Sequence, residues 1–243
     1  MSQPDTIHVA NSPEAGAEAC ASAILATLRT TLESAKRATI ALSGGTSPRL
    51  LFDALAQAQF DWSDVHFFWV DERCVSPVDP QSNFHLADQS LFGPAHISKY
   101  NIHRIHGEMP PAEGAARYVE DLRHEFSLKP GELPVFDIIH RGIGPDAHTA
   151  SLFPGEPLIA DRENIAAAVW VEKLRSHRVT LLPGVLLAAR RTFILAVGTD
   201  KAEPLYHVLK GPLDYFQYPC QIAVRDTASP AEWFIDRDAA AQL

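Results

Sequence analysis

Residues 135–154 read VFDIIHRGIGPDAHTASLFP. The first five are mostly apolar and end in two β-branched residues, which predicts a short buried strand. The two glycines that follow allow a tight turn and a close approach of the backbone to a ligand. Asp146 and His148 then come where open parallel sheets bind their ligands, just after the strand. A histidine beside a carboxylate suits general base catalysis near neutral pH, but a glycine-rich turn with an exposed histidine explains the stretch equally well.

A second stretch repeats this pattern. The apolar run at 38–42 predicts a strand, and Ser43-Gly44-Gly45-Thr46-Ser47-Pro48 leads from it into a predicted helix at 48–58. Ser47 suits the N-cap and Pro48 the first helical position. Free backbone N–H groups and the helix dipole favour an anion there, so the turn predicts a phosphate site. Neither a Walker lysine nor a GxGxxG pattern is present, and an ordinary strand-to-helix turn is the alternative.

Charged residues follow two further predicted strands. Asp71, Glu72 and Arg73 come after the strand at 65–70, where they form either part of a site or a solvated ion-pair cluster. Ser82 or Asn83 is expected to cap the helix at 83–92. After the strand at 192–197, Asp200 and Glu203 have the spacing of a capping box.

Lys201 lies between the two acids, in the first turn of the helix predicted at 200–210. The helix dipole disfavours a cation there. A bound anion beside the lysine would explain its position, and extension of the side chain into water is the alternative.

Strands and helices alternate along the whole chain. Strands are predicted at 6–10, 38–42, 65–70, 134–139, 166–171, 178–182, 192–197 and 220–224, with an edge strand at 233–236. Helices are predicted at 12–32, 48–58, 83–92, 112–126, 183–189 and 200–210. This order favours a single α/β domain over residues 1–243, a Rossmann-like, doubly wound, mostly parallel sheet with helices on both faces.

Composition excludes several classes of protein. The net charge is −9 and no basic stripe is present, which argues against nucleic acid as a partner. No apolar run is long enough for a membrane span, and the first residues lack the features of a signal peptide. Three cysteines without close pairing suggest free thiols in a reducing cytoplasm. The eleven histidines show no ligand spacing such as HExxH, so we expect neither a metal nor another cofactor.

Together these motifs resemble the family of glucosamine-6-phosphate isomerases and 6-phosphogluconolactonases. The resemblance is carried, in the family's order and over nearly the whole chain, by SGGTSP (43–48), DERCV with SN (71–75, 82–83), GIGPDAHTASLFPG (142–155), RVTL (178–181), GTDKA (198–202) and WFID (233–236).

The resemblance implies a sugar phosphate as substrate, a lactone hydrolysed in the oxidative pentose phosphate pathway, and a monomer or weak homo-oligomer. His148 matches the family's catalytic histidine and Asp146 the acid beside it. The phosphate is implied to bind Ser43, Gly44, Gly45, Thr46 and Lys201, and other substrate contacts are implied for Asp71, Arg73 and Arg178.

Three positions bear on whether the chain is a lactonase, a deaminase or a protein that only binds a sugar phosphate. The family's deaminases carry a glutamate where this chain has Phe153, which favours a lactonase over a sugar-phosphate isomerase or deaminase. Ala147 stands where the family has glycine, and is strained if its φ is positive. Arg141, preceded by His140, replaces an apolar residue and faces either the site or solvent. These last departures leave open a non-catalytic sugar-phosphate sensor.

Overall fold

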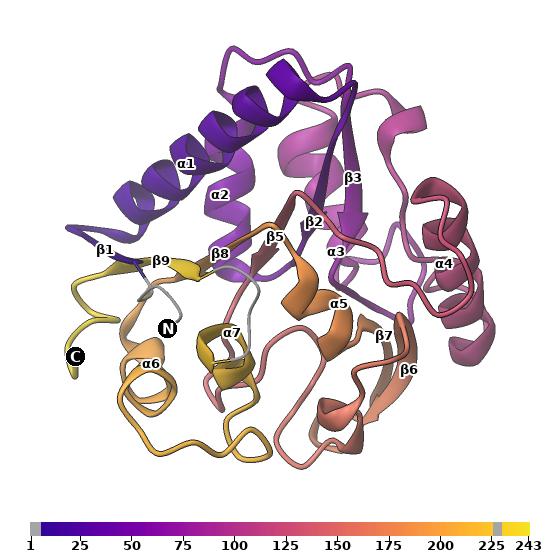
Figure 1. The fold of residues 1–243 in the computed structure, drawn as a ribbon. Helices are drawn as coiled ribbons and strands as arrows, with labels where there is room; N and C mark the ends of the chain where they lie inside the picture. Colours follow the sequence, from indigo (N-terminus) through magenta and orange to yellow (C-terminus); the bar gives the residue numbers. More distant parts are fainter. Residues whose placement is uncertain (1–5, 226–229) are drawn as a thin grey trace.

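The computed structural model describes residues 6–225 and 230–243 (Figure 1). Its largest element is a six-stranded sheet in the order β1-β9-β8-β5-β2-β3, in which every neighbouring pair is parallel. The strands are β1 (Thr6–Ala10), β2 (Ala38–Leu42), β3 (Val65–Trp69), β5 (Ile138–Arg141), β8 (Arg191–Ala196) and β9 (Ala231–Asp236). All five residues of β2 are buried, as expected for a strand covered on both faces.

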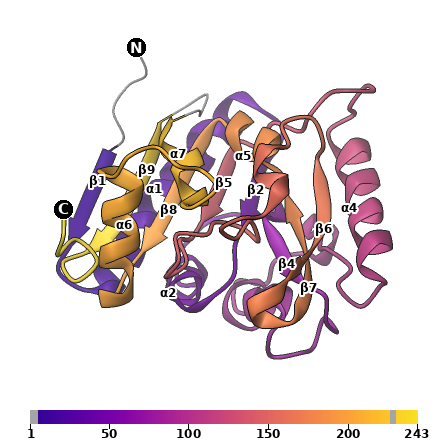
Figure 2. The ribbon, with the colours of Figure 1, turned by 90° about the horizontal axis from the view of Figure 1, so that it is seen from below.

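Helices cover both faces of this sheet, as the sequence predicts. In Figure 1, α1 (Pro13–Ser34) and α2 (Thr46–Ala56) lie above the strands. Below them lie α5 (Pro183–Ala188), α6 (Ala202–Leu209) and α7 (Ile222–Arg225), which come to the front in Figure 2. The predicted α/β class is therefore confirmed. No helix in the described part of the chain is long and apolar enough to cross a bilayer.

A second, smaller sheet was not predicted. It joins β4 (Asp71–Arg73), β7 (Ser176–Leu181) and β6 (Ala166–Val171) in antiparallel pairs. The helix α4 (Pro111–Glu125) packs beside β6 and β7 (Figure 1). Val70 links the two sheets, because its N–H donates to Leu42 O at 2.9 Å and its carbonyl accepts from Leu181 N at 2.8 Å.

The strand predicted at 220–224 is wrong. The chain forms a 3₁₀ turn (Pro219–Gln221) that continues into α7. Buried Gln221 fixes this turn, because its side-chain amide donates to the carbonyls of His207 (3.0 Å) and Pro212 (2.8 Å). A short apolar run has no periodicity that separates a buried helical turn from a strand.

Other predicted elements differ from the structure in their place in the sheet, their first residue or their helix type. The strand at 233–236 is not at an edge, because β9 lies between β1 and β8. The strand predicted from 134 begins at Ile138, because the Asp137 carboxylate accepts from the N–H and hydroxyl of Thr39 and replaces ladder bonds there. The helix at 83–92 is α-helical only in α3 (Asn83–Ala87) and continues as a π turn (Asp88–Phe92).

The order of the strands reverses beside β2. The chain runs from β2 outward to β3 and then returns to β5 on the other side of β2. Loops that leave β2 and β5 therefore diverge at their carboxyl ends. Ligands of open α/β sheets bind in the crevice at such a switch point.

Candidate active site

A cleft of about 200 Å³ opens at the carboxyl ends of β2, β4, β5 and β8. Residues from five separate parts of the chain line it, namely Ser43 to Pro48, Asp71 and Arg73, Gly142 to Pro145 with His148 and Ala150, Arg178, and Leu195 with Lys201. Of the ten residues singled out from the sequence, nine are in this lining. Asp146 contacts the cleft through its bond to His148.

The turn after β2 exposes the first turn of α2 to this cleft. The helix begins at Thr46, with Gly45 as its N-cap at φ 125°, so the prediction of Ser47 as the cap is wrong. No side chain among the described residues caps this helix, which leaves its first N–H groups to a ligand or water. The buried Ser43 Oγ also lacks a hydrogen-bond partner among the described residues.

Asn83 packs against this turn at Gly44. A methyl group on Gly44 would lie 1.9 Å from Asn83 Oδ1, so only glycine fits there. The amide of Asn83 donates to Asp71 O at 2.8 Å, and its backbone N–H donates to the Glu72 carboxylate at 2.7 Å. The sequence identified Asn83 only as a possible cap. The observed cap of α3 is Ser82, whose Oγ accepts from His85 N.

Glu72 supports the fold and does not line the cleft. It is buried, and besides the Asn83 N–H its carboxylate accepts from Ser82 Oγ at 2.9 Å and Phe84 N at 2.8 Å. Burial raises its pKa, and these bonds partly oppose the rise. Glu72 therefore anchors the start of α3, which positions Asn83 against the turn.

The side chains of Asp146 and His148 form a close pair. His148 Nδ1 lies 2.5 Å from Asp146 Oδ1, and the Lys173 ammonium bonds the other carboxylate oxygen. Burial on its own raises the pKa of Asp146, but the hydrogen bonds from His148 and Lys173 outweigh it and hold that pKa below its usual range. Because the carboxylate is ionised, it accepts the Nδ1 proton, which leaves the lone pair of His148 on Nε2.

Gly144 provides the space for the imidazole of His148. A methyl group on Gly144 would lie 1.9 Å from Nδ1 and 2.0 Å from Cε1 of that ring. The turn is closed by two backbone bonds, from Gly144 N to His148 O at 2.9 Å and from Ala147 N to Gly144 O at 3.0 Å.

Ala147 has φ 62°, so the strain considered from the sequence is present. The left-handed conformation costs a residue other than glycine about 1–2 kcal/mol. The methyl group of Ala147 is buried in a cluster that includes Ile143 and Cys220, and one buried methyl contributes about 0.8 kcal/mol. Alanine is tolerated because burial offsets much of the strain.

His140 and Arg141 face neither solvent nor the cleft. Both are fully buried, and neither is in the lining. Burial lowers the pKa of His140 to about 3, so its ring is neutral, and also lowers the pKa of Arg141. Within residues 6–225 and 230–243, no guanidinium nitrogen of Arg141 has a hydrogen-bond partner. Burial of these two side chains therefore lowers the stability of the fold, and neither of them lines the cleft.

Replacing Arg141 by methionine is expected to stabilise the protein. Methionine keeps most of the apolar stem and removes a buried charge without partners, and exchange of buried ionic groups for apolar ones gains about 1–4 kcal/mol. The free energy of unfolding from urea titration measures the change. Lower stability in the variant would contradict this reading and would show that the guanidinium bonds a group outside the described residues.

Two arginines and Asp71 form another part of the cleft lining. Asp71 is buried, accepts from Ser151 Oγ at 2.6 Å, and lies 3.9 Å from Arg178 Nη1. Arg73 donates to the carbonyl of Gln81. Arg73 and Arg178 are paired residues of β4 and β7, so the unpredicted antiparallel sheet brings these two cations together.

Lys201 lines the cleft from the segment that follows β8. It lies at the end of a 3₁₀ turn (Thr199–Lys201) that precedes α6, and its Nζ lies 2.7 Å from Asp200 Oδ2. The N-cap of α6 is Lys201, and no side chain in the described part of the chain caps this helix, so the capping box predicted for Asp200 and Glu203 is wrong.

Lys173 and Phe153 were not identified from the sequence as partners of the pair. The Phe153 ring stacks on His148 with centroids 4.0 Å apart, and Lys173 Nζ lies 4.5 Å from the same ring. Lys173 lies in the 3₁₀ turn (Glu172–Leu174) that connects β6 to β7. No local pattern connects position 173 with position 146, so only the tertiary fold reveals this contact.

Cys74 is no nucleophile for this cleft. It is absent from the lining, and burial together with the nearby Glu72 raises its pKa to about 11, so the thiol is protonated near neutral pH. All three cysteines of the chain are free.

Comparisons with known proteins find a matching family model and similar relatives over most of the chain. A family described as glucosamine-6-phosphate isomerases/6-phosphogluconolactonase matches residues 11–233. A 6-phosphogluconolactonase of Aggregatibacter actinomycetemcomitans is 37% identical over 209 residues, covering 84% of this chain and 87% of the relative. The crystal structure of 6-phosphogluconolactonase from Thermotoga maritima is 26% identical, with a TM-score of 0.82 over 96% of this chain and 99% of that one.

The fold itself is shared more widely. A monomeric glucosamine-6-phosphate deaminase has a TM-score of 0.83 over 98% of this chain and 100% of its own, at 17% identity. At that identity the likeness concerns the fold alone. The fold therefore does not separate a lactonase from a deaminase, and the residues of the cleft must do so.

Proposed function

Because the chain belongs to the family of glucosamine-6-phosphate isomerases and 6-phosphogluconolactonases, we propose that it hydrolyses 6-phospho-D-glucono-1,5-lactone to 6-phospho-D-gluconate, a step of the oxidative pentose phosphate pathway. The observation that carries the assignment is the bonded pair of Asp146 and His148, which lies in one cleft with an uncapped helix N-terminus. The first can activate water and the second can hold a phosphate.

The phosphate binds at the turn after β2. Backbone N–H groups of Gly44, Gly45 and Thr46 and the hydroxyls of Ser43 and Thr46 donate to its oxygens. The 11-residue helix α2 contributes the positive end of its dipole. Lys201 supplies a cation in an otherwise acidic protein.

His148 acts as the general base of this mechanism. Its Nε2 takes a proton from a water molecule as the water oxygen attacks C1 of the lactone. Asp146 orients the imidazole and stabilises the imidazolium that forms, as a carboxylate does in a catalytic triad. The tetrahedral intermediate collapses by breaking the bond from C1 to the ring oxygen, and His148 returns its proton to that oxygen.

The oxyanion that forms on C1 needs donors that are already in place. Arg73 and Arg178 line the cleft, and the loop after β5 provides backbone N–H groups. Electrostatic stabilisation by such donors is often the largest single contribution to acyl transfer. Burial lowers the pKa of Arg178, and the nearby Asp71 carboxylate opposes this and keeps the guanidinium charged. Asp71 therefore has a role that needs no proton transfer.

A deaminase would need a further acid or base for ring opening and for the aldose–ketose shift. At the position of the deaminase glutamate, this chain has Phe153, whose ring packs against the imidazole. An apolar ring cannot transfer a proton, but it shields the pair from bulk water. This contact favours the lactonase over the deaminase.

Comparing lactones with and without the phosphate tests this assignment. We expect kcat/KM to be far higher for the phosphorylated lactone than for D-glucono-1,5-lactone. Lys201→Met should lower kcat/KM for the phosphorylated lactone about 10- to 100-fold, since a hydrogen bond to a charged group is worth about 1.5–3 kcal/mol. It should leave the unphosphorylated lactone unaffected. An equal loss on both substrates would mean that Lys201 does not bind the phosphate.

The proposal includes a reducing cytoplasm as the compartment, in keeping with three free thiols. It also includes a monomer or weak homo-oligomer. Neither nucleic acid nor a membrane is needed for the reaction.

A further inference from the structure

A group of metal-binding side chains lies on the far side of β3 from the cleft. His66, His103 and Glu125 each offer one ligand atom, and these atoms all lie within 4.8 Å of one another. They come from three elements, namely the edge strand β3, the loop after a 3₁₀ turn (Lys99–Asn101), and the end of α4. None of them lines the cleft, and the proposed hydrolysis does not use them.

The two imidazoles meet edge to edge. His66 Nδ1 lies 2.9 Å from His103 Nε2, with the ring planes 19° apart and the centroids at 5.2 Å. Two lone pairs at this distance repel, so one nitrogen must carry a proton that the other accepts. A metal ion can take the place of that proton.

Both rings are held in place by their surroundings. The backbone of His103 donates to Phe67 O at 2.8 Å, and its ring stacks on Phe68 at 4.4 Å between centroids and 7° between planes. His66 lies in the ladder between β3 and β2, opposite Thr39. The two histidines are thus held in place before an ion binds.

The three donor groups suit a cation, because an imidazole offers the lone pair of a ring nitrogen and a carboxylate offers oxygen ligands. Two neutral imidazoles and one carboxylate are a donor set that zinc takes.

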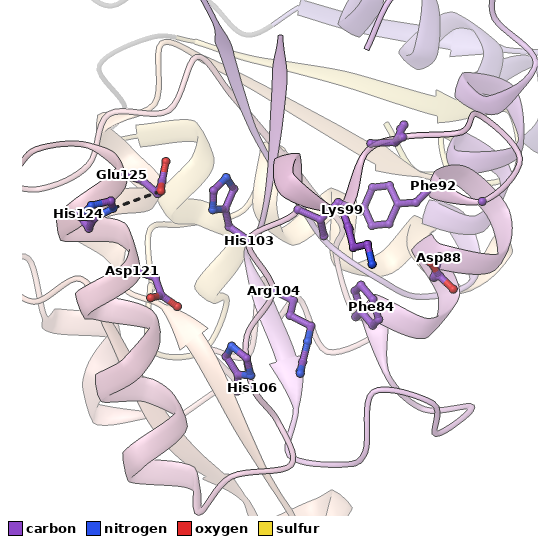
Figure 3. A pocket seen from close by; sticks show the side chains of 13 residues that line it. Phe84, Asp88, Phe92, Lys99, His103, Arg104, His106, Asp121, His124 and Glu125 are labelled. Carbon is purple, nitrogen blue, oxygen red and sulfur yellow. Dashed lines mark hydrogen bonds and ion pairs between the residues drawn. The ribbon is translucent and has the colours of Figure 1, made fainter. Parts of the chain in front are cut away.

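A cavity gives an ion access to this group. It has a volume of about 460 Å³, lies between α4 and the loop at 99–106, and is lined in part by His103, Glu125 and Asp121 (Figure 3). In Figure 3 the carboxylate of Glu125 and the ring of His103 lie together at one end, with His106 further along the loop. Water in the cavity can fill a fourth coordination position.

We propose that His66 Nδ1, His103 Nε2 and the Glu125 carboxylate bind a divalent transition-metal ion, with Zn²⁺ the best match. Two bonds of about 2.0–2.1 Å at the tetrahedral angle place the nitrogens about 3.3 Å apart, so the rings need to separate only slightly. Arg37 Nη1 lies 3.1 Å from Glu125 Oε2. To bind the ion, the Glu125 carboxylate must therefore turn away from Arg37 and toward the two histidine rings. The bound ion ties the end of α4 to the edge of the main sheet.

Arg37 limits the affinity, because it is a cation beside the site. The other charged groups nearby are Asp64 and Asp121, which favour the metal, and His124, whose Nδ1 lies 3.4 Å from Glu125 Oε1. The acids offset part of the repulsion from Arg37.

Binding of Zn²⁺ and Co²⁺ to the full-length protein tests the proposal. The titration is made by competition with a chromophoric chelator, first without 6-phosphogluconate and then with it at a saturating concentration that blocks the cleft. We expect one equivalent to bind, Co²⁺ to show the visible absorption of a tetrahedral site, and Zn²⁺ to raise Tm. His103→Asn should weaken binding at least about 10- to 100-fold, the range found for loss of groups that support a metal site. His106→Asn, three residues along the same loop, is the matched control and should bind as the wild type does.

His66→Asn provides a second variant in case His103→Asn does not fold, and the Tm of each metal-free variant shows whether it folds. Equal affinities in the wild type and both cluster variants would overturn the proposal. So would an equal loss in His106→Asn, or a metal that 6-phosphogluconate displaces, since the ion would then be in the cleft beside His148.

Discussion

Replacing His148 by asparagine is expected to lower kcat for lactone hydrolysis about 10²- to 10⁴-fold, which is the usual contribution of a general base. Asparagine is close in size but cannot accept a proton from water. His148 is not among the proposed phosphate contacts, so the affinity for 6-phosphogluconate should change far less than kcat does. The rate is measured with spontaneous hydrolysis subtracted.

Binding of 6-phosphogluconate to this variant is the control. Retained binding with lost turnover would place the defect in the chemical step. If the variant kept the wild-type rate above the spontaneous one, His148 would not be the base.

Replacing Gly144 by alanine is expected to be nearly as damaging as removing the imidazole itself. The added methyl group would lie 1.9 Å from His148 Nδ1, so the ring must leave its position and its bond to Asp146 must break. A displacement of about 1 Å in a reacting group costs on the order of 10²-fold in rate. We expect kcat/KM for the lactone to fall by at least this factor.

Gly142→Ala is the matched control for this prediction. It lies two residues earlier in the same turn, and a methyl group there meets nothing within 4 Å. This variant should keep nearly the wild-type kcat/KM. Equal losses in the two variants would point to a general defect of the turn, and a fully active Gly144→Ala would contradict the position of the imidazole.

Much of the cleft could be predicted from the sequence, because its residues follow directly after apolar strands. The turn after β2 and the turn before His148 each place their residues at the carboxyl edge of one parallel sheet. Local order along the chain is enough to predict this. The same reasoning brought Lys201 to the edge from the end of β8.

Contacts between distant segments could not be predicted in this way. Lys173 reaches Asp146 only because β6 and β7 form a separate sheet. His66 and His103 are 37 residues apart in the sequence, so a search for local ligand spacing could not pair them. The sequence also left Arg141 open between site and solvent, since a strand end does not show how deeply its side chain is buried.

Wild-type turnover of freshly prepared 6-phospho-D-glucono-1,5-lactone is the most direct test of the account, with D-glucosamine 6-phosphate offered in parallel. We expect rapid, saturable lactone hydrolysis well above the spontaneous rate, and no ammonia from the amino sugar. Ammonia release would contradict the proposed lactonase activity in favour of a deaminase. Saturable binding of 6-phosphogluconate without turnover of either compound would contradict it in favour of a sugar-phosphate sensor.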